Sequence, residues 1–300
     1  MVVYAHRGCT ELGKVAKNGR EELEMNMYRR DSGQQSDEGE IWERCFMGER
    51  KAWLKHLSKY VKPSKIVEFG CGSGFVLEAL SVDFAGSIIV GVDNSPRELE
   101  KLAQKHLNNV ILVKADITEN VLPHENFDTA IFVATLHEVF SELGKGKVQD
   151  AFKVAHGVLK DNGVLIIQDF LKPSSRLVEI AFKNEETRRR FIRFVNEFRP
   201  RKVKFEETRD GVKLDIADAA EFISKHHYSP NGEDWEEEMS ETHFFFTEEE
   251  YKEIARQAGF IVEDSMKLPR SENLWTETRK DIEFNFETEY GWIQLVLTKK

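Results

Sequence analysis

One segment of the chain strongly limits how it can fold: residues 66–80, which read IVEFGCGSGFVLEAL. An apolar run leads into glycines at every second position, Gly70, Gly72 and Gly74, and an amphipathic pattern begins directly after them. Glycine lets a backbone turn tightly and approach a ligand closely, and a helix start offers unpaired N–H groups to an anionic group. The segment therefore predicts a strand, a glycine turn and a helix, as in a nucleotide-type cofactor site.

The spacing of these glycines narrows the choice of cofactor. The dinucleotide fingerprint has its third glycine one position later, where this chain has Phe75. The pattern is thus GxGxG rather than GxGxxG, which disfavours a nicotinamide-dependent oxidoreductase. An ordinary glycine-rich turn between a strand and a helix would show the same letters, so the neighbouring segments have to decide.

The next two apolar runs also end in acidic residues. Residues 87–92 stop at Asp93, and residues 110–115 stop at Asp116. At the C-terminal ends of parallel strands, one carboxylate can accept the hydroxyls of a ribose, and another, beside an aliphatic residue, suits an adenine. With two later runs and helical patterns between them, the chain predicts a doubly wound, mostly parallel sheet; the later runs are residues 129–134 and 164–168.

Together these motifs resemble the class I S-adenosylmethionine-dependent methyltransferases, over roughly residues 61–171 and more weakly from residue 246 to the end. The resemblance implies S-adenosyl-L-methionine as the cofactor and a Rossmann-like α/β fold with a seven-stranded sheet. It implies that the turn wraps the methionine part of the cofactor with Glu68, Gly70, Cys71, Gly72 and Gly74. The ribose is then expected at Asp93 and Asn94, and the adenine at Asp116 and Ile117.

The resemblance also divides the chain into three parts. Residues 1–60 are an N-terminal extension with a cap helix, and residues 61–172 and 246–300 are the methyltransferase core. Residues 173–245 are an inserted helical lid. Helical patterns cover residues 176–198 and 216–227 of the insertion. An insertion after the fifth strand lies above the C-terminal edge of the sheet, where ligands bind in open α/β sheets. We therefore expect the lid to form the acceptor pocket and to set specificity.

The lid supplies the candidates for acceptor binding. His227, Tyr228 and His243 lie close to aromatic residues that could line a pocket, and we predict that they bind substrate. Histidine pairs more often form hydrogen bonds or lie on the surface than bind metal, and no third ligand stands at a usable spacing. We therefore predict no metal site.

The end of the fourth strand, which faces the transferred methyl group in the resembling enzymes, carries the catalytic candidates. It reads Ala134-Thr135-Leu136-His137-Glu138. We expect Ala134 to contact the cofactor, His137 to act as a general base because its ordinary pKa lies near neutrality, and Glu138 to orient His137 or contact substrate. The alternative is that His137 only packs or caps. The Asp/Asn-Pro-Pro-aromatic tetrad of enzymes acting on base amines does not occur here, which disfavours that substrate class.

The preferred function is accordingly methyl transfer to an oxygen, nitrogen or carbon atom of a small molecule. A basic stretch at residues 188–204 favours a second reading, an RNA or protein methyltransferase, although such runs are more often solvated or paired with acidic residues. A third reading is a protein that binds the cofactor without turnover.

Composition sets the remaining bounds. The net charge of −10 argues against a chain-wide nucleic-acid footprint but does not exclude a local one. No apolar run approaches a membrane-spanning length, and the first ten residues lack the apolar core of a secretory signal. The three cysteines show neither disulfide nor zinc spacing. We expect a cytoplasmic protein without membrane contact, and the sequence leaves open whether it forms a homodimer.

Overall fold

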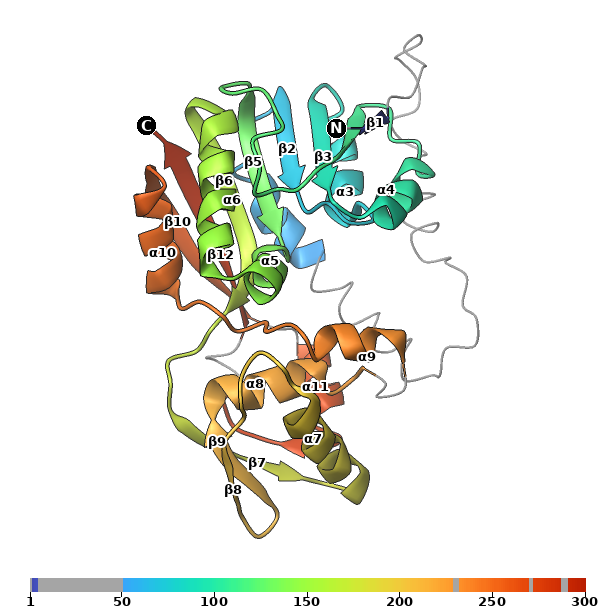
Figure 1. Ribbon diagram of the computed structural model, residues 1–300, viewed down its shortest axis with the longest axis vertical. Coiled ribbons are helices and arrows are strands. Elements are labelled where there is room, and N and C mark those ends of the chain that lie inside the picture. The colour runs from blue at the N-terminus through green and yellow to red at the C-terminus, as the bar shows by residue number, and fades with distance from the viewer. Residues whose placement is uncertain (1, 5–50, 229–231, 270–271, 287–290) are drawn as a thin grey trace.

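The structure is a computed structural model that describes residues 2–4, 51–228, 232–269, 272–286 and 291–300. Its main sheet has eight strands in the order β1-β4-β3-β2-β5-β6-β12-β10 (Figure 1). The strands are β1 (Val2–Tyr4), β2 (Lys65–Phe69), β3 (Ile88–Asp93), β4 (Val110–Lys114), β5 (Phe127–Val133), β6 (Leu159–Leu171), β10 (Phe260–Pro269) and β12 (Gly291–Lys299).

The five central strands run parallel, as their apolar sequences predict. β2 pairs with β3 and β5, β3 with β4, and β5 with β6, all in parallel register, while β12 and β10 join antiparallel at one edge. These are the seven strands expected from the sequence. The additional strand β1 pairs antiparallel with β4 at the other edge. Its three residues carried no strand signal strong enough to predict it.

Helices cover both faces of this sheet, which explains why its strands are apolar on both sides. The helices are α3 (Phe75–Asp83), α4 (Pro96–Ala103), α5 (Leu136–Leu143), α6 (Lys145–Val158) and α10 (Glu248–Gln257). α4 begins with a side-chain cap, because the Ser95 side chain accepts a hydrogen bond from the Glu98 backbone N–H. Residues 51–58, the described part of the predicted cap helix, are also helical. Most of the predicted extension, residues 1–60, lies outside the described residues.

The insertion forms a second unit beyond the C-terminal edge of the parallel strands (Figure 1). It holds a four-stranded sheet, ordered β11-β7-β9-β8, with helices packed on it. Its strands are β7 (Leu177–Phe182), β8 (Phe205–Glu207), β9 (Gly211–Asp215) and β11 (Ile282–Glu283). Its helices are α7 (Glu185–Glu197), α8 (Ile216–Lys225), α9 (Glu233–Glu238) and α11 (Glu272–Thr278). The expectation of a purely helical insertion was therefore wrong.

The error has a local cause at residues 176–198, which we predicted as one helix. The first part, LVEIAF, alternates between exposed and buried positions in β7 and pairs with β9. The helix begins only after Asn184, whose side chain accepts a hydrogen bond from the Thr187 backbone N–H. The β9 backbone passes so close to β7 that a Cβ at Gly211 would lie 1.9 Å from the Ile180 carbonyl oxygen. Apolar residues alone do not distinguish such a strand from a helix.

The C-terminal segment also crosses between the two units. Residues 272–286, which we placed with the core, contain β11, and β11 pairs with β7 of the insertion. Trp275, Phe284 and Phe286 pack in the same apolar cluster as Phe191 and Phe222. Two separate segments of the chain thus build the second unit. Among the described residues, the helices all fall short of the length and apolarity needed to cross a membrane.

Candidate active site

The glycine turn between β2 and α3 is held by backbone contacts. The N–H groups of Gly70 and Cys71 donate hydrogen bonds to the Val92 carbonyl oxygen at 2.8 and 3.1 Å. Gly70, Gly72 and Gly74 have φ angles of +70°, +47° and +85°, which other residues adopt only with strain. The sequence pattern therefore reflects a real backbone requirement.

The three glycines differ in what surrounds them. A Cβ at Gly70 would lie 2.3 Å from Cγ2 of Thr135, and one at Gly74 would lie 2.2 Å from Cδ1 of Leu102. A Cβ at Gly72 would meet nothing within 4 Å. The outer glycines thus allow the turn to pack against the protein, whereas Gly72 leaves an open cradle in front of the turn.

Asp93 links this turn to the end of β3. Its Oδ2 accepts a hydrogen bond from the Gly72 N–H at 2.7 Å, and its Oδ1 accepts one from the Ser95 N–H at 2.8 Å. Each carboxylate oxygen keeps a further lone pair for a ligand hydroxyl. The backbone thereby fixes the orientation of the carboxylate, and its predicted role at the ribose stays a prediction.

Glu68 lies beneath the turn with one unpaired oxygen. The residue is 2% exposed, and among the described atoms its Oε2 has no hydrogen-bond partner. Burial, together with the nearby Asp93 charge, raises the pKa of Glu68 well above its usual range. A buried acceptor without a donor is costly, so the arrangement suits a ligand with a donor or a positive charge. The amino and sulfonium groups of S-adenosylmethionine fit this requirement.

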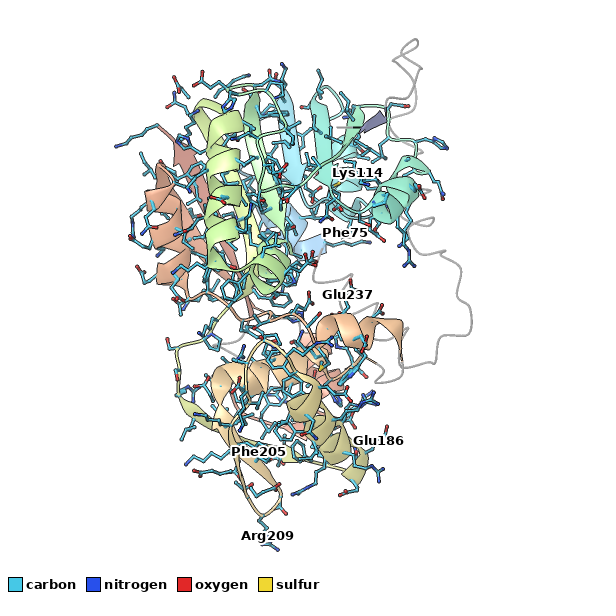
Figure 2. The ribbon with its side chains drawn as sticks, viewed as in Figure 1. Phe75, Lys114, Glu186, Phe205, Arg209 and Glu237 are labelled. Atoms are coloured by element: carbon cyan, nitrogen blue, oxygen red, sulfur yellow. The ribbon has the colours of Figure 1, made fainter. Side chains whose placement is uncertain are left out.

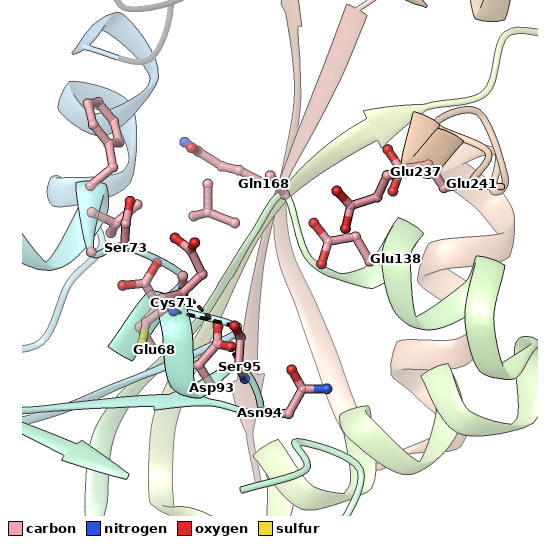
Figure 3. Close-up of a pocket in the computed structure, with 18 of the residues that line it drawn as sticks. Glu68, Cys71, Ser73, Asp93, Asn94, Ser95, Glu138, Gln168, Glu237 and Glu241 are labelled. Carbon is pink, nitrogen blue, oxygen red and sulfur yellow. Dashed lines mark hydrogen bonds between the residues drawn. The ribbon is translucent and has the colours of Figure 1, made fainter. Parts of the chain in front are cut away.

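One cavity of about 790 Å³ joins the glycine turn to the second unit. Figure 3 shows the carboxylates of this cavity, with Glu68 and Asp93 on one side and Glu138, Glu237 and Glu241 on the other. Phe75 and Glu237 also line it, and in Figure 2 they stand on the facing edges of the two units. The cavity therefore has a wall in each unit: a cofactor half at the glycine turn and an acceptor half at Glu138, Glu237 and Glu241.

Most of the predicted residues line this cavity. They are Glu68, Gly70, Cys71, Gly72, Gly74, Asp93, Asn94, Ala134, Glu138 and Tyr228. Of the described residues that we predicted for the site, five lie outside the lining: Asp116, Ile117, His137, His227 and His243. Asp116 instead accepts a hydrogen bond from the Thr118 N–H at 2.8 Å. Its predicted role at the adenine, like that of Ile117, stays a prediction.

The sequence did not indicate several lining residues. Trp53, Gln168 and Trp292 come from the helix at residues 51–58, β6 and β12, and Glu237 and Glu241 come from α9 and the loop after it. Ala134, which has a φ of +53°, turns the chain at the end of β5 and lies in the same wall. The acidic run at residues 232–250 was visible in the sequence, but a charge run does not reveal which of its members face a cavity.

His137 lies in the first turn of α5 and is only 4% exposed. Its Nδ1 lies 2.8 Å from Oδ1 of Asp169, whose Oδ2 accepts a hydrogen bond from the Leu136 N–H. Burial alone would lower the pKa of His137, but the charge and hydrogen bond of Asp169 raise it to about 9. At neutral pH the ring is therefore protonated and cannot accept a proton, which argues against the predicted general base.

Glu138, the next residue along α5, faces the cavity (Figure 3). Water reaches its side chain through the cavity, yet the surrounding protein atoms raise its pKa to about 7 by desolvation. The positive charge of His137 opposes this shift, while Glu241, Asp169 and Asp93 reinforce it. A carboxylate with this pKa can accept a proton near neutral pH.

His243 belongs to a buried polar cluster rather than to the cavity wall. Its ring stacks on Phe170 with centroids 4.1 Å apart, and its Nδ1 lies 3.0 Å from Oγ of Ser224. Its Nε2 lies 3.1 Å from Glu241 Oε1 and 3.3 Å from Lys225 Nζ. The ring of His227 lies tilted against that of Tyr228, with centroids 4.2 Å apart.

The fold brings His137 close to Glu241 and His243, two potential metal ligands from a distant part of the sequence. Ligand atoms of His137, Glu241 and His243 lie within 4.8 Å of one another. The Lys225 ammonium, however, lies beside His243 and donates a hydrogen bond to Glu238 at 2.8 Å. This internal cation already supplies positive charge to the cluster, so we assign no metal to it.

The basic stretch is largely engaged in internal contacts. Arg188 pairs with Glu207, Arg193 with Glu197, and Arg201 with Asp218. Arg190 and Arg199 donate hydrogen bonds to the carbonyl oxygens of His226 and Glu236. These contacts agree with the alternative that the stretch pairs with acidic residues of its own unit.

Comparisons with known proteins place this geometry in a family context. Residues 67–167 match the family model described as a methyltransferase domain. No curated protein sequence matches the chain.

Among solved structures, an S-adenosylmethionine-dependent methyltransferase from Mesorhizobium loti has a TM-score of 0.53 and 17% identity, covering 84% of this chain and 98% of that one. The [4+2]-cyclase SpnF has a TM-score of 0.51 and 15% identity, covering 91% and 85%. A chain from the complex of the Haloferax volcanii Trm112 methyltransferase activator with a protein named as a methyltransferase has a TM-score of 0.51 and 14% identity, covering 89% and 99%. At these identities the likeness shows the fold.

The sheet order and the site together define a class I methyltransferase fold, as the sequence predicted. The match to a methyltransferase domain at residues 67–167 falls on the part of this fold that holds the glycine turn, Asp93 and Glu138.

Proposed function

We propose that the protein transfers a methyl group from S-adenosylmethionine to a small molecule bound between α5 and the second unit. The observation that carries this proposal is the continuous cavity that joins the glycine turn to Glu138, Glu237 and Glu241. Its volume of about 790 Å³ lies within the range of small-molecule and cofactor sites. The insertion would then act as the lid that sets specificity, with strands as well as helices in its construction.

The cofactor half of the cavity would hold S-adenosylmethionine through local groups. Gly72 leaves room for the methionine part, and the unpaired Oε2 of Glu68 supports a positively charged or donor group nearby. The remaining lone pairs of Asp93 would accept the ribose hydroxyls, with Asn94 beside them. The bound cofactor supplies an electrophilic methyl group on a sulfonium.

The protein's part in catalysis is to position the acceptor and to remove a proton where the acceptor carries one. Glu138 is better placed for the second task than His137, because it lines the cavity and has a pKa of about 7. His137 would be a positioning residue: its contact with Asp169 ties the start of α5 to the end of β6. We therefore transfer the proposed base from His137 to Glu138.

Tyr228 would contact the acceptor, because it lines the cavity. His243 would act indirectly, through its contact with Glu241. The structure offers no comparable support for His227 as a substrate ligand.

Calorimetric titration with S-adenosylmethionine and S-adenosylhomocysteine tests the cofactor assignment. We expect micromolar binding of both and no binding of NAD. Asp93→Ala should weaken binding by about 100-fold, because charge-assisted hydrogen bonds are lost and the turn loses its anchor. Asp83→Ala, at an exposed position at the end of α3, is the matched control and should bind normally. Binding of NAD alone, or equal binding by both variants, would contradict the proposal.

Methyl transfer to RNA or protein, with none to small molecules, would instead support the alternative based on the basic stretch. Cofactor binding without transfer to any acceptor class would support a binding protein without turnover. A steep loss of RNA binding with salt would accompany the first of these outcomes.

A further inference from the structure

We propose that the acceptor is a small protonated amine, that its ammonium group binds among Glu138, Glu237 and Glu241, and that the product is the N-methylated amine. This inference rests on the proposed function and names its substrate class. It depends on the negative charge of the acceptor half of the cavity, on the carboxylates there that have no internal partner, and on the aromatic residues in its walls.

The acceptor half is lined by carboxylates from three parts of the chain. Glu138 comes from α5, Glu237 from α9, and Glu241 from the loop after α9, and Figure 3 shows their carboxylates directed into one space. Among the described lining residues, Arg97 is the only lysine or arginine, and it belongs to the cofactor half beside Asn94 and Ser95. An anionic acceptor would meet repulsion here, whereas a cation would relieve it.

Two of these carboxylates have no internal use. Within the described part of the chain, the side chains of Glu138 and Glu237 form neither a hydrogen bond nor an ion pair. Glu238, their neighbour in α9, shows the contrast: its carboxylate accepts a hydrogen bond from Lys225 Nζ at 2.8 Å. Glu238 also lines the cavity, but a buried primary ammonium already neutralises it, whereas Glu138 and Glu237 are left for a ligand.

The same contrast favours an ammonium over a metal ion. Lys225 already places an ammonium 2.8 Å from Glu238 and 3.3 Å from His243 Nε2, so a metal shared by His137, Glu241 and His243 would bring a second cation close to it. An ammonium held farther out, at Glu138 and Glu237, makes no such conflict.

The walls of the cavity suit the organic part of an amine. Trp53 and Trp292 both line it and lie with ring centroids 4.3 Å apart, and Tyr228 lines it from the second unit. Aromatic faces contact apolar groups and attract cations near them.

The chemistry balances with the groups present. A protonated amine has no lone pair, so its ammonium first gives a proton to the Glu138 carboxylate. The freed nitrogen pair then forms the N–C bond, and the electrons of the breaking C–S bond pass to sulfur. The products are S-adenosylhomocysteine and a methylated ammonium, and Glu138 returns its proton to water. The pKa of Glu138, raised to about 7, supports this exchange.

Binding of matched ligands to the complex with S-adenosylhomocysteine tests the proposal, using 2-phenylethylamine, 2-phenylethanol and phenylacetate. These share an aromatic body and differ in charge. Ethylamine and ethanol form a second pair without the ring. We expect each amine to bind at least about tenfold more tightly than its alcohol, and phenylacetate not to bind. A preference for an alcohol or for phenylacetate would overturn the proposal, and so would failure of both amines to bind while S-adenosylhomocysteine binds normally.

Two variants locate the effect. Glu237→Gln should weaken amine binding about tenfold and leave alcohol binding unchanged. Glu138→Gln should lower kcat for amine methylation by about 100-fold and remove the rise of rate with pH near 7, while cofactor affinity is retained. The groups that set this pH dependence are His137, Glu241, Asp169 and Asp93.

Glu206→Gln, at an exposed position on β8, is the control and should change nothing. Amine binding that both cavity variants leave intact would overturn the proposal. If the unmodified protein did not bind S-adenosylhomocysteine, the proposed function itself would be overturned. The two failures are therefore distinguishable.

Discussion

The two halves of the cavity are built by different means. The cofactor half consists of turns that directly follow β2 and β3, and backbone N–H groups hold its key carboxylate, Asp93. The acceptor half consists of side chains from α5, α9 and the following loop, about one hundred residues apart in sequence. The cofactor half depends on backbone conformation, whereas the acceptor half depends on which charged side chains the fold brings together.

This difference explains how one fold can retain a cofactor and change its acceptor. Most side-chain substitutions near the glycine turn would leave its N–H groups in place, but those at Gly70 or Gly74 would not, because a Cβ has no room there. In the acceptor half, a single charge change alters what the cavity attracts. The solved structures of the same fold include a cyclase, so the fold alone does not determine the reaction.

The largest expected effect tests how far the acceptor half depends on buried charge pairs. Lys225 is fully buried, 2.8 Å from Glu238 and 3.9 Å from Glu221. Lys225→Met should lower the free energy of unfolding by about 4 kcal/mol, because two buried carboxylates lose their cation. Urea denaturation measures this, and Lys213→Met, exposed on β9, is the control. Equal midpoints for the two variants would show that the pairs do not support the second unit.

The next effect concerns the link between α5 and β6. Since the folded-state pKa of His137, about 9, lies above its ordinary 6.5, its contribution to stability is complete below pH 6.5 and is lost as pH rises through 9. The full contribution is about 3 kcal/mol. His137→Asn keeps a donor for Asp169 and should abolish this alkaline decline. The measurement is the free energy of unfolding of both proteins between pH 6 and 10. An equal decline of this free energy in both would refute the assignment of the alkaline decline to His137.

A pair of glycine substitutions separates packing from ligand binding in the cofactor half. Gly70→Ala should cost about 3 kcal/mol of stability, because the positive φ and the contact with Thr135 both oppose a Cβ. Gly72→Ala should cost only about 1 kcal/mol yet weaken cofactor binding about tenfold, because its Cβ enters the cradle. Thermal unfolding and calorimetry measure the two quantities. Equal stabilities would contradict the packing argument.

The smallest expected effect tests whether the cofactor half extends to β4. Asp116 does not line the cavity, and only the family resemblance assigns it to the adenine. Asp116→Ala should weaken S-adenosylmethionine binding about fivefold, less than the change at Asp93, because one hydrogen bond to a neutral amine is at stake. Glu119→Ala, at an exposed position just beyond Asp116, is the control. Unchanged affinity would place the adenine elsewhere.

The sequence by itself determined the core of the fold and most of the cofactor half. The turn at Gly70 to Gly74 and the carboxylate of Asp93 depend on contacts between neighbouring strand ends, so their spacing in the chain is enough to predict them. The same local logic applies to the start of α4, which the Ser95 side chain caps. These features depend on backbone geometry, which short motifs encode directly.

Only the tertiary structure decided the acceptor half. It buried His137 against Asp169, directed Glu138 into the cavity and brought His243 and Glu241 near them. It also turned residues 177–182 into a strand, because β9 and β11 were available to pair with them. Charge, pKa and strand pairing depend on neighbours distant in sequence, and no local pattern records which neighbours the fold will bring together.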